Sequence, residues 1–153
     1  MKVYFIFEIK EEFVSLYLDN SRVLFNILRN IYFLEREEVE FGYSLFRQIT
    51  NPIDKGFIDR RIFLKCHQDI PYSKRSNIHY INNLYRDEVS RLIVKNSYIR
   101  LEMEQVKSSF FDILRDYSDN YFVCDFKHYD FFFLSHTNLD KIRVFTHYNK
   151  VLV

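Results

Sequence analysis

The first twenty residues constrain the fold most, because a strand-like run leads directly into a helix-like run with too much apolar surface. Residues 2–9, KVYFIFEI, are rich in Val, Tyr, Phe and Ile and predict a buried strand. Residues 9–20, IKEEFVSLYLDN, predict the first turns of a helix. Their apolar side chains cover roughly 200° of the helix surface, about twice what a helix lying on a core needs. These side chains are Phe13, Val14, Leu16, Tyr17 and Leu18.

Composition and charge describe a globular chain with no general attraction to nucleic acid or to membranes. Its 153 residues fit one domain, and 48% of them are apolar while 28% are charged. The 22 basic and 21 acidic residues leave a net charge of +1, which favours no polyanionic partner. No apolar run is as long as a transmembrane helix, which needs about 18 residues. The N-terminus does not resemble a signal peptide. Two cysteines without a disulfide framework fit a reducing cytoplasm, where we expect the protein to act.

The helices are concentrated in the first third of the chain. Residues 11–33 predict two helices separated at 19–21, because Asp, Asn and Ser compete with the helix backbone and cap the helix that follows. A third helix is expected over residues 36–50, before Pro52. A fourth, over residues 105–118, carries apolar side chains at helical spacing.

The second half of the chain is expected to consist mainly of strands. Residues 60–67, RRIFLKCH, alternate in a way that predicts a strand, and the polar residues 68–77 predict a loop. Two hairpins are expected, one within residues 91–104 that turns at Asn96-Ser97 and one within 121–134 that turns at Lys127-His128.

This order of elements predicts an α+β fold. We expect a single domain over residues 1–135, with a mixed β-sheet and helices packed mainly on one face. Residues 136–153 are expected to form a C-terminal extension or an edge strand.

The cysteines and histidines do not form a recognisable metal or catalytic motif. Cys66-His67 and Cys124 with His128 are far apart in the sequence, whereas structural zinc sites bring paired ligands at close spacing. Both cysteines alternate onto apolar faces of the expected strands, which is typical of buried free cysteines. We therefore expect both thiols to be reduced and buried, and we expect no metal site.

Other sequence features give no reason to expect an enzyme. No histidine stands in a nucleophile motif, and Glu37-Glu38 at a helix start is explained by the helix dipole. Neither Gly42 nor Gly56 belongs to a phosphate-binding loop, so no cofactor is expected.

Two short basic segments with aromatic neighbours leave direct DNA binding as a minor alternative. They are residues 58–63, IDRRIF, and 72–77, YSKRSN. Because the overall charge is balanced, we interpret them as solvated surface and expect no direct nucleic-acid binding.

The helix over residues 11–18 presents two apolar faces about 100° apart. One follows the i, i+3, i+4, i+7 spacing and consists of Phe13, Leu16, Tyr17 and Asn20. The other consists of Val14 and Leu18, compact side chains suited to packing on a sheet. Phe13 and Tyr17 then either point outward as an aromatic pair or form the core side of the helix, and the pattern alone favours the core side.

Four segments resemble the family of sporulation inhibitors of replication, SirA. The most specific is IKEEFVSLYL at 9–18, after the aromatic N-terminal strand. The others are RVLFNILRN with Phe25, QITNPI at 48–53 and FFDILRDYSDNYFVCDF at 110–126. The similarity covers roughly residues 4 to 135.

The resemblance implies a regulatory protein without catalysis. Family members bind the N-terminal domain of the replication initiator DnaA and suppress initiation at the chromosome origin during sporulation. Two aromatics of the first helix make the contact, and they match Phe13 and Tyr17. Helix geometry, not the family motif, adds Leu16 and Asn20 as partner-binding residues. A generic protein-interaction module with a different partner is the alternative.

Overall fold

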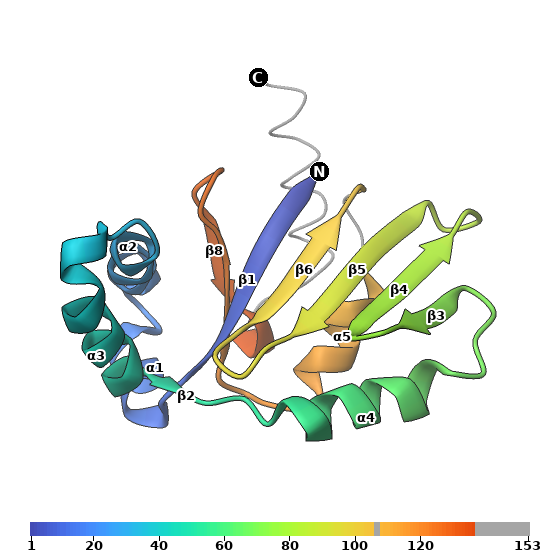
Figure 1. The fold of residues 1–153 in the computed structure, drawn as a ribbon, viewed down its shortest axis with the longest axis horizontal. Helices are drawn as coiled ribbons and strands as arrows, with labels where there is room; N and C mark the ends of the chain where they lie inside the picture. Colours follow the sequence, from blue (N-terminus) through green and yellow to red (C-terminus); the bar gives the residue numbers. More distant parts are fainter. Residues whose placement is uncertain (106–107, 137–153) are drawn as a thin grey trace.

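The first strand lies inside an eight-stranded sheet, and the other elements are arranged around it (Figure 1). The computed structural model describes residues 1–105 and 108–136. Its helices are α1 (Glu11–Tyr17), α2 (Ser21–Tyr32), α3 (Val39–Ile49), α4 (Lys55–Cys66) and α5 (Ser109–Arg115), with short 3-10 helices η1 (Arg36–Glu38) and η2 (Leu134–His136). Its strands are β1 (Lys2–Ile9), β2 (Thr50–Asn51), β3 (Tyr72–Arg75), β4 (Ile78–Asn83), β5 (Glu88–Val94), β6 (Ile99–Met103), β7 (Tyr121–Asp125) and β8 (Asp130–Phe133).

The sheet is antiparallel at every strand pairing between described residues. Its order is β3-β4-β5-β6-β1-β7-β8, and the short β2 pairs with the end of β1. Phe5 pairs with Arg100 of β6 on one side and with Cys124 of β7 on the other. The α+β class is confirmed, but the expectation of a mixed sheet is wrong. Short turns join β3 to β4, β4 to β5, β5 to β6 and β7 to β8, and such turns allow only antiparallel pairs.

Helices cover both faces of the sheet, so the expectation that they pack mainly on one face is also wrong. In β1, Tyr4 and Ile6 point into a core shared with α4 and α5. Phe7 and Ile9 point the opposite way, into a core shared with α1, α2 and α3. Figure 1 shows α1, α2 and α3 grouped apart from α4 and α5. The physical reason is that β1 is apolar at both odd and even positions, so each face needs its own cover.

Residues 60–66 of the stretch expected to form a strand belong to the helix α4, and His67 is its C-cap residue. Asp54 caps this helix, because its Oδ1 accepts a hydrogen bond from the Phe57 N–H at 3.1 Å. Ile58, Ile62 and Cys66 are spaced four apart and are buried on the sheet. Exposed apolar residues on the other side of the helix hide this spacing and produce the apparent alternation.

Part of the loop expected at 68–77 is the strand β3, which pairs with β4 at the edge of the sheet. Only Tyr72 of β3 is buried, and Lys74 and Arg75 are exposed, so the strand has the polar character of an edge. Ser76 turns the chain with a φ of 55°.

The strand expected over 2–9 is confirmed as β1. The helix expected over 36–50 is formed by η1 and α3 and ends at Ile49, because Thr50 belongs to β2, and the helix expected over 105–118 is the shorter α5. The break at 19–21 separates α1 from α2, and both hairpins turn where expected. The prediction for residues 136–153 lies outside the described residues from 137 on, and the boundary at 135 stays a prediction.

We expect Asp54→Ala to lower the free energy of unfolding by about 0.5–2 kcal/mol, because the substitution removes the cap of α4. Asp54→Asn retains a capping oxygen and is the matched control, with a much smaller effect. Urea denaturation of the three proteins measures the difference. Equal stability of Asp54→Ala and the unsubstituted protein would contradict the importance of this cap.

Candidate partner-binding site

Helix α1 is held at a fixed place on the edge of one core. The chain leaves β1 at Ile9, and the Lys10 N–H donates to the carbonyl of Ile49 at the end of α3 at 2.9 Å. The carbonyl of Lys10 then accepts from the N–H groups of Phe13 and Val14, which starts the first turn. Glu11 and Glu12 follow in this turn, where the helix dipole favours negative charge. The start of α1 is therefore tied both to the sheet and to α3.

Phe13 and Tyr17 lie side by side on α1 with their rings stacked. The ring centroids are 6.4 Å apart and the planes differ by 11°. Both rings are half-buried and pack against the core beneath α1, α2 and α3. They therefore lie between the two alternatives that the sequence allowed, because each ring has one part on the core and another part in solvent.

The other residues in and just after α1 divide between core and surface. Val14 is only 8% exposed, as its expected packing on the sheet requires. Leu18, expected to pack with it, is 39% exposed, because the helix ends at Tyr17 and Leu18 is its C-cap residue. Leu16 is 63% exposed, and Asn20 is exposed at the N-cap position of α2. The candidate patch, defined as Phe13, Leu16, Tyr17 and Asn20, thus combines two anchored rings with two exposed neighbours.

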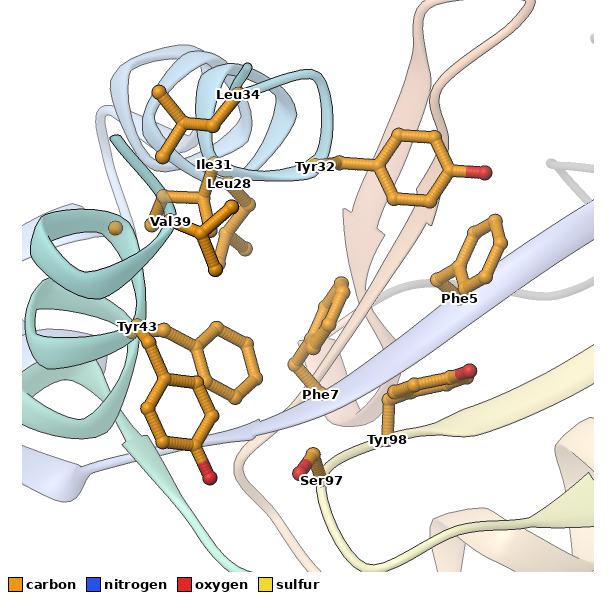
Figure 2. Close-up of a pocket in the computed structure, with 12 residues that line it drawn as sticks. Phe5, Phe7, Leu28, Ile31, Tyr32, Leu34, Val39, Tyr43, Ser97 and Tyr98 are labelled. Carbon is orange, nitrogen blue, oxygen red and sulfur yellow. The ribbon is translucent and has the colours of Figure 1, made fainter. Parts of the chain in front are cut away.

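A separate apolar pocket, which sequence reasoning missed, lies between α2, α3 and the sheet (Figure 2). It has a volume of about 250 Å³. Figure 2 shows the rings of Phe7 and Tyr98 on the sheet side and Leu28, Ile31 and Val39 on the helix side. The pocket is built from segments far apart in the sequence, so no local pattern could have revealed it.

Gly42 allows the connection between α2 and α3 to pack closely beside this pocket. A Cβ atom at position 42 would lie 2.0 Å from Cδ1 of Leu34, which is much closer than carbon atoms can approach. The absence of a side chain at residue 42 therefore lets Leu34 lie against α3.

The two cysteines are buried on opposite faces of the sheet. Cys66 belongs to the core under α4, and Cys124 belongs to the core under α1, α2 and α3. Burial raises the pKa of both thiols, that of Cys124 most strongly. Among residues 1–105 and 108–136, no group of three or more His, Cys, Asp or Glu side chains could hold a metal ion.

His79 is a fully buried polar side chain with a partner at each ring nitrogen. His79 lies under α4 and contacts the Tyr72 hydroxyl at 2.8 Å through Nδ1 and an Asp59 carboxylate oxygen at 2.7 Å through Nε2. Burial lowers the pKa of His79, although the Asp59 carboxylate opposes that shift. Because both ring nitrogens of His79 have hydrogen-bond partners, its burial is explained by a structural role.

Comparison with known proteins connects the chain to one family. The family model described as "Sporulation inhibitor of replication protein SirA" matches residues 2–138. No curated protein matches the sequence. No helix in the described part of the chain is both long enough and apolar enough to cross a membrane.

We expect Phe13→Ala and Tyr17→Ala each to lower the free energy of unfolding by about 1–2 kcal/mol. Each substitution removes the partly buried area of one ring and leaves the other ring without its stacking partner. Phe25→Ala, which removes a fully buried ring, should cost about 3–5 kcal/mol. Leu16→Ala should change stability by no more than about 0.5 kcal/mol. Chemical denaturation of the four variants makes the comparison. A loss for Phe13→Ala as large as that for Phe25→Ala would place Phe13 in the core.

We expect Cys66 and Cys124 to react slowly with a thiol reagent in the native protein and rapidly in denaturant. Both thiols are buried, and their raised pKa values leave little of the reactive thiolate near pH 8. The measurement is the rate of thiol labelling with and without denaturant. Immediate labelling of the native protein would show that one thiol is accessible.

Proposed function

The chain belongs to the family of the sporulation inhibitor of replication protein SirA, and we propose that it acts by binding the N-terminal domain of the initiator DnaA. The family description makes it an inhibitor of replication during sporulation. The identity of the partner comes from the resemblance of the first helix to the family's binding helix. The proposed action takes place in the cytoplasm, where the chromosome origin lies, and needs no catalytic residue, cofactor or metal.

The stacked pair of Phe13 and Tyr17 is the observation that carries this proposal. Each ring is partly fixed by the core and partly open to solvent. Aromatic rings held in this way are suited to be interface anchors, because little conformational freedom is lost when a partner covers them. Leu16 extends the apolar surface beside them, and Asn20 supplies a polar edge.

Inhibition follows from occupation of a surface on the initiator. Two aromatic anchors that fill an apolar groove supply most of the affinity of such an interface, with polar neighbours around them. A groove filled by α1 is closed to other regulators. A domain carrying this added protein is also hindered from assembling with other initiator molecules on DNA. Both routes depend on the same contact.

We expect Phe13→Ala and Tyr17→Ala each to weaken binding of the DnaA N-terminal domain by about 2 kcal/mol or more, which is about thirtyfold in affinity. Tyr85→Ala is the matched control, because Tyr85 is a fully exposed aromatic in the turn between β4 and β5. Its loss should leave the affinity unchanged. Titration calorimetry with the purified initiator domain measures these affinities, and melting curves confirm that each variant is folded.

Three outcomes would count against the proposal. Unchanged binding by a folded Phe13→Ala variant would show that the patch is not the site. Failure of the unsubstituted protein to bind the initiator domain would favour a different protein partner. Tight binding of duplex DNA at physiological salt, without the initiator, would favour the DNA-binding alternative.

A further inference from the structure

A second pocket, rich in basic side chains, lies away from the α1 patch and shares no residue with it. It opens between the last turns of α2, the first half of β1, strand β6 and the turn that joins β7 to β8, and its volume is about 700 Å³. Arg29, Arg100, Lys127 and His128 line it, and we call it the basic pocket. This volume lies in the range typical of sites for small ligands.

The basic pocket has an excess of positive charge that its own residues do not neutralise. Among the described residues that line it, Asp125 is the one carboxylate, and it accepts from Nδ1 of His128 at 2.7 Å and from the backbone N–H groups of Lys127 and His128 at 3.1 Å. Neither Arg29 nor Lys127 forms an ion pair with a carboxylate of the described residues. The surplus favours an anionic ligand.

Arg29 is already held in place. Its guanidinium carbon lies 4.8 Å from the ring centroid of Phe33 and 4.5 Å from that of Tyr129. Its Nε donates to the carbonyl of Phe126 at 3.4 Å. A guanidinium held against two rings loses little freedom when it binds an anion, so its remaining N–H groups are prepared for a ligand.

Arg100 provides a donor whose partner is missing. Its Nη2 lies 3.2 Å from Glu102, a carboxylate that also pairs with Arg91. Its Nε is buried and has no hydrogen-bond partner among the described residues. Buried donors normally have partners, so this N–H makes a negative charge nearby favourable. The Arg100 side chain is 40% exposed, and it is this accessible part that the pocket offers to an anion.

The walls of the basic pocket are aromatic. Phe5, Tyr32 and Phe33 line it, and the centroids of Phe5 and Tyr32 are 5.1 Å apart. Planar bases stack on aromatic rings and on guanidinium planes, and the arginine fork matches phosphate oxygens. Cations beside aromatic rings therefore suit a ligand with a planar ring and phosphate groups better than they suit an aliphatic acid.

We propose that the basic pocket binds a nucleoside phosphate, with the phosphates on Arg29, Arg100 and Lys127 and the base against the aromatic wall. This ligand is distinct from the protein partner of α1, and its binding requires no contact with the initiator. The basic pocket is therefore a second binding site, for a small molecule, in addition to the α1 patch.

Titration calorimetry of the full chain with ATP, without divalent cations, tests the proposal. Adenosine and inorganic phosphate serve as the separate halves of the ligand. We expect ATP to bind at least tenfold more tightly than either half and less tightly as salt rises. Arg29→Gln and Lys127→Gln should each weaken ATP binding by about tenfold or more, as loss of a charge-assisted hydrogen bond does.

Arg61→Gln is the matched control, because Arg61 is an exposed arginine on α4, which covers the other face of the sheet. It should leave ATP binding unchanged. Lys127→Gln keeps the test decisive if Arg29→Gln loses stability with its ring contacts, since Lys127 lies exposed in a turn. Melting curves identify any variant that is not folded.

Other outcomes would overturn the proposal. Absence of ATP binding at millimolar concentration would do so directly. Equal binding of inorganic phosphate would indicate a general anion patch, and equal loss of ATP binding in Arg61→Gln would indicate diffuse charge attraction. A Glu-rich peptide that competes as strongly as ATP, with the same dependence on Arg29 and Lys127, would assign the pocket to an acidic protein segment.

Discussion

The packing of β1 on both of its faces is the interaction on which the rest of the structure depends. Its backbone is hydrogen-bonded to β6 on one side and to β7 on the other, so it joins β3, β4, β5 and β6 to β7 and β8 in one sheet. Tyr4 and Ile6 contribute to one core, and Phe7 and Ile9 contribute to the other. Burial of large apolar side chains is the main stabilising term in folding. A polar substitution at Tyr4 or Ile6 would therefore weaken the packing of α4 and α5, and one at Phe7 or Ile9 would weaken that of α1, α2 and α3.

The position of the proposed interface follows from this strand. The chain passes from Ile9 into α1 with a single residue between them, and Lys10 is hydrogen-bonded to the end of α3. Val14 faces the core, so the neighbouring Phe13 and Tyr17 must lie at its edge. The same geometry that stabilises the fold thus keeps two aromatic rings partly open to solvent, where a partner can cover them.

Several features could be predicted from the sequence because they depend on local patterns. The strand at 2–9, the break at 19–21 and the two C-terminal hairpins depend on residue type and short-range turns. Helix α4 was missed because Phe63 and Leu64 are exposed and conceal the buried spacing of its inner face.

Features that depend on contacts between distant segments could not be predicted in this way. Spacing alone could group Phe13 with Tyr17, but how deeply they are buried depends on the core that β1, β7 and the first helices build together. The basic pocket likewise combines Arg29, Arg100 and Lys127 from three separate parts of the chain.

The most direct measurement for the role of α1 is an NMR titration of the isotope-labelled protein with the DnaA N-terminal domain. We expect the backbone amide signals of Glu11–Tyr17 and Asn20 to shift or broaden, while those of β3 and β4 stay unchanged. Unchanged α1 signals with changes confined to another surface would contradict the account.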